Sequence, residues 1–287
     1  MLNILRLTNK ELKDGTAMLL GGFDGLHLGH RQLLSRAKES GLPVGIMTIL
    51  GGKDESVFTL AERAEIFRRV GLDFAVAFSF SEIKELSPAE FLTILEKEFS
   101  PKLYVCGDDF RFGKNAQGTT ETLRQSVATR VIVENLLLEN GEKISTRTVK
   151  KRLSEGEVEK ANALLCEEFF LLGEVYRDRG VGKTLNFPTA NIRYPKDKFP
   201  IKKGVYETCV TVDGNGYKGI TNFGARPTFD DGTVVTETHL DGFSGDLYGK
   251  TLKITFKRFL RETIKFTDAE ALRKQLQTDI RRVREND

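Results

Sequence analysis

The segment AMLLGGFDGLHLGH, residues 17–30, changes character halfway along its length. It opens with an apolar run that predicts a buried strand over 17–23, and a helix is expected from about Leu28 to Ser40. The glycines between them allow a tight turn and a close approach of a ligand to the backbone. Backbone N–H groups at a helix start are unpaired and lie at the positive end of the helix dipole, so the segment predicts an anion site.

Two of the three histidines in the chain, His27 and His30, lie at the end of this segment. They are three residues apart, so they share one face of an incipient helical turn. Two imidazoles beside a bound phosphate can donate hydrogen bonds to the charge that develops during phosphoryl or nucleotidyl transfer. A structural turn with surface histidines is the alternative interpretation.

Strands and helices continue to alternate after this segment. We expect strands over 43–50, 74–78 and 102–107 and helices over 59–71 and 87–99. Thr59 and Ser87 are the predicted N-caps, and Glu90 completes a capping box with Ser87. Such alternation implies βαβ units and a mostly parallel sheet, in which ligands bind beyond the carboxyl ends of the strands. The first half is therefore predicted to be an α/β domain.

The second half of the chain has the pattern of an all-β domain, which is expected to form a small barrel. Its short strands are expected over 169–176, 204–212, 217–224, 233–240 and 251–260. One amphipathic helix closes the chain, with Thr267 as its predicted N-cap and Glu270 at the boxed position. Residues 151–166 have the pattern of a helical linker, so the predicted domains are 1–150 and 167–287.

The composition is that of a soluble globular protein, with 39% hydrophobic residues, 30% charged residues and a net charge of +3. So small a net charge argues against nucleic acid as a partner, because nucleic-acid binding normally shows a basic face. The N-terminus lacks the long apolar stretch of a secretion signal, and no apolar run reaches the roughly 18 residues of a membrane span. The three cysteines form no CxxC pair, which argues against a zinc site. We therefore expect a cytoplasmic protein without a membrane partner.

A second polar loop, CGDDFRFGKNAQG at 106–118, follows the last strand of the α/β half. Two interpretations are equally good. Phe110 and Phe112 are exposed and stack on a flat ring while Arg111 holds phosphate, or the two phenylalanines simply pin the loop to the core.

The loop RGVGKTLNFPTANI at 179–192 follows the first strand of the β half. The hydroxyl of Thr189 and the amide oxygen of Asn191 suit a hard cation such as Mg²⁺. Lys183 can act as a point charge for phosphate. The spacing is not that of a Walker A loop, and from the residues alone an ordinary turn explains the segment equally well.

Several of these segments resemble the motifs of known families. The pattern G-x-F-D-x-x-H-x-G-H at 21–30 is similar to the nucleotidyltransferase signature, and 106–118 is similar to a loop near the flavin site of bacterial FAD synthetases. Residues 179–192 resemble the G-R-x-L-G-F-P-T-A-N signature of riboflavin kinases, and 222–228 and 236–249 resemble two further kinase segments. Along nearly its full length, the chain resembles the bifunctional riboflavin kinase/FMN adenylyltransferases.

This resemblance implies a Rossmann-like nucleotidyltransferase domain, followed by a Greek-key β-barrel riboflavin kinase domain with a C-terminal helix. The barrel would transfer the γ-phosphate of ATP to riboflavin, and the α/β domain would join AMP from a second ATP to FMN, giving FAD and pyrophosphate. Mg²⁺ is the implied cofactor, and small molecules are the expected partners. Two alternatives remain: a chain that keeps one activity, the kinase in preference, or a flavin-sensing or RNA-binding regulator built on a degenerate enzyme.

The resemblance also implies roles for individual residues. The implied catalytic residues are His27, His30 and Glu237, with Glu237 as the general base of the kinase. His239 shares the side of the strand on which Glu237 lies, and it is expected to be a solvated strand residue. The implied nucleotide and flavin contacts of the first domain are Gly21, Gly22, Phe23, Asp24, Asp109, Phe110, Arg111, Phe112, Asn115, Ser145, Thr146, Arg147 and Lys150. Those of the kinase domain are Gly182, Lys183, Thr184, Pro188, Thr189, Asn191, Asn222, Arg226 and Arg261, with Thr189 and Asn191 as the metal ligands.

The chain departs from the family pattern at four places. The F-x-P-H-P segment is replaced by ILGGKD at 49–54, and the triphosphate-binding I-S-S-T-R-I-R is replaced by ISTRTVK at 144–150. In the latter, Lys150 keeps the charge of the final arginine but loses its bidentate fork. The kinase loop has Lys183 in place of Arg and Asn186 in place of Gly. The first two departures concern the adenylyltransferase half, which is therefore the activity that the chain would lose first.

Overall fold

The structure is a computed structural model of the whole chain, and it describes residues 3–12, 15–52, 55–135, 138–139, 142–177, 189–225, 234–266 and 268–285. The chain divides into two compact units. The first consists of Met1–Val149 and Leu164–Glu167, and the second of Lys150–Ala163 and Glu168–Asp287.

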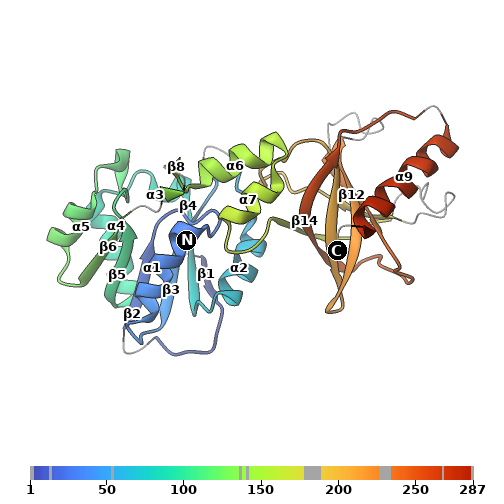
Figure 1. Cartoon of the computed structure of the whole chain (residues 1–287). Coiled ribbons are helices and arrows are strands. Elements are labelled where there is room, and N and C mark those ends of the chain that lie inside the picture. Colours follow the sequence, from blue (N-terminus) through green and yellow to red (C-terminus); the bar gives the residue numbers. More distant parts are fainter. Residues whose placement is uncertain are drawn as a thin grey trace. The chain divides into compact units, whose positions relative to one another are not determined.

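The first unit is built on a six-stranded sheet with the order β1-β4-β3-β2-β5-β6 (Figure 1). Its strands are β1 (Asn3–Arg6), β2 (Thr16–Leu20), β3 (Val44–Leu50), β4 (Phe74–Ser79), β5 (Pro101–Gly107) and β6 (Arg130–Glu134). All neighbouring strands from β4 to β6 are parallel, and β1 pairs with β4 in the antiparallel direction. The mostly parallel, Rossmann-like sheet is thus confirmed, with two edge strands, β1 and β6, that were not predicted.

The three predicted helices of the first unit begin where the sequence indicated: α1 (Leu28–Lys38), α2 (Leu60–Arg69) and α4 (Pro88–Phe99). Three short helical elements were not predicted: α3 (Phe80–Ile83), the 3-10 turn η1 (Lys114–Ala116) and α5 (Thr120–Ser126). Thr59 and Ser87 both take part in capping boxes, and the backbone N–H of Ser87 donates to Glu90 at 2.8 Å. These local hydrogen bonds satisfy backbone groups that a helix start leaves unpaired.

The strand order places a ligand site at one edge of the sheet. β2 pairs with β3 on one side and with β5 on the other. The connection from β2 runs to β3, toward one side of the sheet, and the connection from β5 runs to β6, toward the other side. Ligands in doubly wound sheets bind at the carboxyl ends of the strands at such a switch point. The glycine turn 21–25 follows β2, and the loop 106–118 follows β5, so both predicted site segments begin at this edge.

The second unit is a nearly closed antiparallel barrel with the strand order β10-β13-β12-β11-β14-β9. Its strands are β9 (Phe170–Glu174), β10 (Thr189–Arg193), β11 (Gly204–Val212), β12 (Asn215–Ala225), β13 (Val234–Leu240) and β14 (Thr251–Arg261). β14 returns to lie beside β11 after three consecutive strands, which is the Greek key. The Tyr176 N–H donates to the Asn191 carbonyl at 3.0 Å, a bridge that joins the two outer strands.

Three buried threonines form a hydroxyl chain across the barrel. Thr221 Oγ1 lies 2.9 Å from Thr208 Oγ1 and 2.9 Å from Thr238 Oγ1, and all three side chains are buried. Each hydroxyl can donate once and accept twice, so the chain satisfies polar atoms that would otherwise be costly to bury.

Two helices, α6 (Thr146–Glu155) and α7 (Val158–Leu164), occupy the region predicted to be a helical linker. The Asn162 side chain donates to the Phe256 carbonyl and accepts from the Phe169 N–H, both at 2.8 Å. The short strands β7 (Leu138–Glu139) and β8 (Glu142–Lys143) precede α6. Most of this region is therefore packed as part of the second unit.

The last helix, α9 (Ala269–Arg284), is capped by Asp268 and not by Thr267 as predicted. The Ala271 N–H donates to Asp268 Oδ1 at 2.8 Å, so Glu270 lies one position too early for a capping box and pairs with Arg273 instead. The aspartate competes well for this position, because Asp and Thr are both good N-caps. Val283 of this helix packs in a buried cluster with Val205 and Ile220.

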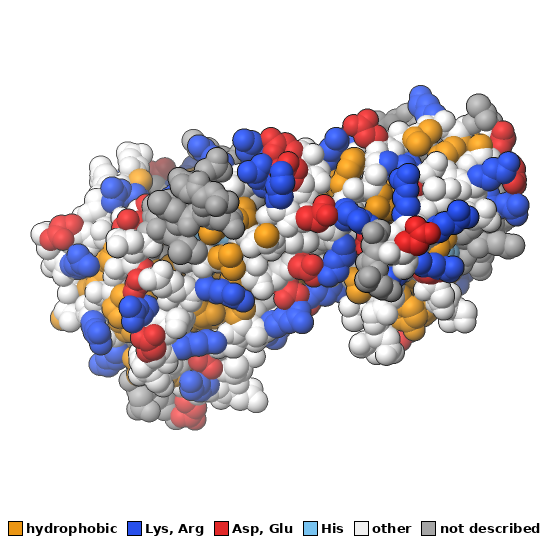
Figure 2. Space-filling view, in the orientation of Figure 1, with side chains coloured by type: hydrophobic (Ala, Val, Ile, Leu, Met, Phe, Trp, Pro, Cys, Tyr) orange, Lys and Arg blue, Asp and Glu red, His pale blue; other side chains and the backbone are white. Residues whose placement is uncertain are grey.

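Figure 2 shows basic and acidic side chains interspersed over the face in view. Among the described residues, no helix combines the length and the apolar composition needed to cross a membrane. Cys106 is fully buried, and burial raises the pKa of its thiol to about 12, as expected for a small core residue.

Candidate active sites

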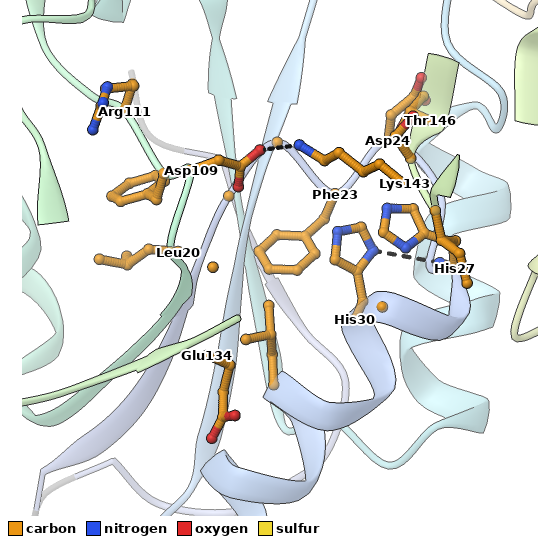
Figure 3. Close-up of a pocket in the computed structure, with 18 of the residues that line it drawn as sticks. Leu20, Phe23, Asp24, His27, His30, Asp109, Arg111, Glu134, Lys143 and Thr146 are labelled. Atoms are coloured by element: carbon orange, nitrogen blue, oxygen red, sulfur yellow. Dashed lines mark hydrogen bonds and ion pairs between the residues drawn. The ribbon is translucent and has the colours of Figure 1, made fainter. Parts of the chain in front are cut away.

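A pocket of about 500 Å³ lies at the carboxyl ends of β2 and β5 in the first unit (Figure 3). The predicted site residues that line it are Gly21, Gly22, Phe23, Asp24, His27, His30, Asp109, Phe110, Arg111, Ser145, Thr146 and Arg147. Phe112, Asn115 and Lys150 are not among its lining residues. The structure thus gathers three segments, 21–30, 107–111 and 143–147, around one cavity.

The two histidines form a stacked pair at the start of α1. Their ring centroids are 3.6 Å apart and their planes differ by 20°. The backbone N–H of His27, the N-cap residue, donates to Nδ1 of His30 at 3.3 Å, which leaves the His30 proton on Nε2. Figure 3 shows the two rings side by side, with Phe23 next to His30.

Both imidazoles are neutral near pH 7. Burial and, after it, the Lys143 charge lower the pKa of His27 from 6.5 to about 4, while Asp109 acts in the opposite direction. Burial and then the neighbouring His27 hold the pKa of His30 well below 6.5. His27 Nδ1 is buried without a hydrogen-bond partner, so this ring retains capacity for a ligand.

Asp24 holds the glycine turn in place. Its Oδ1 accepts hydrogen bonds from the Val57 N–H at 2.8 Å and from Arg63 Nη2 at 2.9 Å. Phe23, just before it, has a φ of +39°, a left-handed conformation that is uncommon for a bulky residue. Asp24 therefore lines the pocket and also stabilises the backbone of the turn.

Lys143 is a pocket residue that sequence reasoning missed. Its Nζ donates to Asp109 Oδ2 at 2.5 Å, so the pair joins the segment before α6 to the loop after β5 (Figure 3). The side chain is 41% exposed, which leaves the ammonium accessible to an anionic ligand. Its position immediately before the predicted phosphate-binding stretch 144–150 was the available signal.

Glu134 is a second lining residue that was not predicted. It ends β6, and its carboxylate accepts hydrogen bonds from Gln32 at 2.6 Å and Arg36 at 2.7 Å, both on α1. The carboxylate is satisfied by these two donors and fixes the wall of the pocket opposite Asp24 (Figure 3).

The loop 106–118 is pinned to the core by its two phenylalanines. Phe110 and Phe112 are buried and stack on each other with centroids 5.5 Å apart, and Phe112 packs against Phe91. Of the two interpretations of this loop, the one with exposed aromatic rings was wrong and the one with a pinned loop is confirmed, because both rings join the apolar cluster under α4. Phe110 still contributes to the pocket wall, whereas Asn115 is exposed and has a φ of +54°.

The start of α6 presents Arg147 to the pocket and directs Lys150 elsewhere. Ser145 caps the helix, since its Oγ accepts from the Thr148 N–H at 3.2 Å. Lys150 Nζ lies 5.5 Å from the centre of the Phe199 ring, in the second unit. The exposed cation that this helix turns toward the first site is therefore Arg147.

A second group of predicted residues meets on the barrel. Glu237 on β13 pairs in register with Asn191 on β10 and with Asn222 on β12. Side chains that are directly opposite on antiparallel strands have Cβ atoms about 5 Å apart on one face. The structure thus brings three polar residues together that lie far apart in the sequence.

Thr189 extends this group along β10, because residues two apart in a strand point to the same face. Thr189 pairs in register with the half-buried His239 on β13. On its other side, His239 pairs in register with Ile220 on β12. Asn191 is only 6% exposed, while Glu237 and Asn222 are half-buried. The Thr263 hydroxyl donates to Asn222 Oδ1 at 3.4 Å.

Arg261, which was predicted to contact nucleotide or flavin, is engaged with the last helix. Its Nη2 donates to Asp279 Oδ2 at 2.7 Å and its Nε donates to the same oxygen at 3.1 Å, and the Asp279 side chain is fully buried. The pair fastens the end of β14 to α9. The remaining predicted residues of the kinase loops, Gly182, Lys183, Thr184, Pro188 and Arg226, lie outside the described residues.

Comparison with known proteins assigns a family to each half of the chain. The FAD synthetase family model matches residues 9–148, and the riboflavin kinase family model matches residues 165–286. A crystal structure of a macrolide-efflux protein from Streptococcus pneumoniae is similar in fold, with a TM-score of 0.83 and 26% identity over 96% of this chain and 97% of that one.

Curated relatives match over nearly the full length. The bifunctional riboflavin kinase/FMN adenylyltransferase of Bacillus subtilis is 31% identical over 94% of this chain and 92% of its own. The protein of the same name from Mycoplasma pneumoniae is 32% identical over 92% of this chain and 94% of its own. With both family models, the stacked histidines at the sheet switch point and the Glu237 group on a Greek-key barrel, the chain belongs to the family of bifunctional riboflavin kinase/FMN adenylyltransferases.

Proposed function

We propose that the chain phosphorylates riboflavin to FMN with one ATP and adenylylates FMN to FAD with a second ATP, releasing pyrophosphate. The names of its relatives support both activities. We assign the adenylyltransferase to residues 1–150, the kinase to residues 167–287 and a helical connection to 151–166. Its partners are small molecules, and we expect it to act in the cytoplasm.

The pair of neutral imidazoles at the N-terminus of α1 is the observation that best supports the adenylyltransferase activity. An oxygen of the FMN phosphate attacks the α-phosphorus of ATP, the bond from that phosphorus to the bridging oxygen breaks, and pyrophosphate leaves. Negative charge builds up on the oxygens around the α-phosphorus as this happens. Imidazole N–H groups of His27 and His30, with the helix N-terminus, are placed to stabilise that charge.

Two cations at the same pocket support the binding of the polyphosphate. Lys143 and Arg147 both line the cavity, and each retains an exposed side chain. A positive charge next to a leaving pyrophosphate offsets the charge that it acquires. We propose that these two side chains bind the phosphates of ATP. In the absence of a ligand, Lys143 forms an ion pair with Asp109.

The kinase activity rests on the Glu237 group of the barrel. The terminal hydroxyl of the ribityl chain attacks the γ-phosphorus of ATP, its proton passes to the Glu237 carboxylate, and ADP leaves. A primary alcohol is a weak nucleophile near neutral pH, so a carboxylate at hydrogen-bond distance assists its deprotonation. Asn222, the neighbour of Glu237 in register, is placed to orient the carboxylate or the flavin hydroxyls.

The residues beside Glu237 fit a magnesium ion. Thr189 offers a hydroxyl oxygen and Asn191 an amide oxygen on the same face of β10, and hard cations prefer such oxygen ligands. When bound, Mg²⁺ supplies positive charge that offsets the charge of the ATP phosphates. We propose these two residues as its protein ligands.

One assay tests the proposal. Purified protein is incubated with riboflavin, ATP and MgCl₂, and the flavins are separated by chromatography over time. The proposal predicts FMN first and FAD after it. A chain that stops at FMN has kept only the kinase. A chain that leaves riboflavin unchanged lacks the kinase, and if it also fails to convert supplied FMN to FAD it is neither enzyme.

A further inference from the structure

A buried arginine lies behind the glycine turn of the first site. Arg63, on α2, is only 1% exposed, although an arginine in an amphipathic helix normally reaches solvent. Its guanidinium donates to the Phe58 carbonyl at 2.9 Å, to the Ile49 carbonyl at 2.9 Å and to Asp24 Oδ1 at 2.9 Å. A rigid planar fork can serve several acceptors at once in this way, which a lysine cannot do.

The fourth acceptor of Arg63 connects it to the turn itself. Arg63 Nη1 donates to Thr48 Oγ1 at 2.7 Å, and Thr48 is fully buried at the end of β3. Because that oxygen accepts from the arginine, the single proton of the hydroxyl is directed away from it. Thr48 Oγ1 lies 3.2 Å from the Gly22 carbonyl oxygen and 3.3 Å from the Phe23 carbonyl oxygen, so the hydroxyl donates toward these two acceptors.

The turn held in this way supports a histidine. Phe23 has a φ of +39°, and its ring centre lies 4.6 Å from that of His30. A Cβ on Gly21 would come within 2.8 Å of the Phe23 ring, so the ring packs closely against the backbone at Gly21. A shift of the Gly22–Asp24 backbone would therefore move Phe23 and release His30 from its stack with His27.

We propose that Arg63 is a positioning residue for the adenylyl transfer: through Thr48 and Asp24 it fixes the Gly22–Asp24 turn, and through Phe23 it fixes His30. Arg63 itself does not line the pocket. The inference rests on the proposed adenylyltransferase function. It predicts that loss of the guanidinium affects the rate of the chemical step more than the binding of ATP or FMN, because the phosphate-binding cations lie on other segments.

The test compares Arg63→Ala with Arg68→Ala, an exposed arginine one turn further along the same helix. FAD formation is measured from FMN and ATP, and FMN formation from riboflavin and ATP. A displacement of about 1 Å costs roughly a hundredfold in rate, so kcat for FAD formation should fall 10- to 100-fold in Arg63→Ala, with KM values within about threefold. FMN formation, and both activities of Arg68→Ala, should stay near wild type. Millimolar guanidinium should restore part of the lost kcat.

Thr48→Val provides the second arm, since it removes the hydroxyl while conserving volume. If Arg63 acts through Thr48, the double variant Arg63→Ala/Thr48→Val should lose little more than Arg63→Ala alone, because the two residues belong to one network. Losses that multiply would overturn the route through Thr48. If Arg63→Ala fails to fold, Thr48→Val alone must show the fall in kcat at constant KM, and normal turnover in it would overturn the proposal. A wild-type protein that makes no FAD would refute the adenylyltransferase function itself, which is a separate result.

Discussion

The imidazole rings of His27 and His30 are stacked, with centroids 3.6 Å apart and planes within 20° of parallel. Two cationic rings would repel each other in this arrangement, and burial already disfavours a charge on either one. The stack therefore requires neutral imidazoles, which act as dipolar N–H donors and not as positive charges.

The first prediction concerns the protonation of this pair. The chain has three histidines, so its imidazole NMR signals can be assigned with the variants His27→Gln and His30→Gln. His27 should stay neutral from pH 8 down to about pH 5, since its pKa lies at about 4. A midpoint for His27 near 6.5 would show that the ring is hydrated and that burial does not lower its pKa.

The same shift predicts how stability depends on pH. The pKa of His27 is about 4 in the folded protein and 6.5 when unfolded. Between these values the unfolded state binds a proton that the folded state does not, so the free energy of unfolding falls as pH drops from about 6.5 to about 4, by roughly 3 kcal/mol in total. Urea unfolding at pH 7 and pH 5 should show a smaller loss in His27→Gln than in the wild type. Equal losses would contradict the shift.

The second prediction separates two cations of the phosphate-binding stretch. Arg147 lines the first pocket, whereas Lys150 lies over the Phe199 ring. A hydrogen bond to a charged group contributes about 1.5–3 kcal/mol, so Arg147→Ala should raise KM for ATP in FAD formation by about tenfold or more. Lys150→Ala should change it by less than about threefold. The reverse order would show that Lys150 turns toward the nucleotide when ATP binds.

The third prediction concerns a short segment far along the chain that supports His27. The Cys166 N–H donates to the Leu26 carbonyl at 2.8 Å, and Leu165 forms a bridge with His27. Cys166→Pro removes the donor, whereas Cys166→Ala keeps it and removes only the thiol. The first variant should lower FAD formation about tenfold, and the second should be near wild type, with FMN formation preserved in both. If Cys166→Ala is as impaired as Cys166→Pro, the thiol and not the backbone pairing matters.

Local signals allowed much of the α/β half to be predicted. The caps at Thr59 and Ser87 are short-range hydrogen bonds within one turn, so the residues that make them identify the helix starts. The apolar runs before the glycine turn and before Gly107 likewise became β2 and β5. The edge of the sheet at which the pocket lies could be predicted from the alternation of strands and helices, because parallel strands place their carboxyl ends together.

The errors and omissions in the α/β half have long-range causes, whereas the error at the last helix is local. Phe110 and Phe112 lie in a polar loop, and only the apolar cluster under α4 explains why both rings turn inward. Arg63 has the sequence context of a surface residue, yet its four acceptors come from segments up to 39 residues away. The N-cap of α9 moved by one residue because Asp268 and Thr267 are both suitable caps.

The most direct test of two separate active sites is a crossed assay with His27→Ala and Glu237→Gln. Each variant is given riboflavin with ATP and, separately, FMN with ATP, and the flavin products are quantified. His27→Ala should convert riboflavin to FMN at the wild-type rate and lose FAD formation by 10²–10³, the range for one preorganised donor. Glu237→Gln should form FMN slowly and yet convert supplied FMN to FAD normally. If either substitution lowers both activities equally, or if Glu237→Gln turns riboflavin over at the normal rate, the assignment of the two sites is wrong.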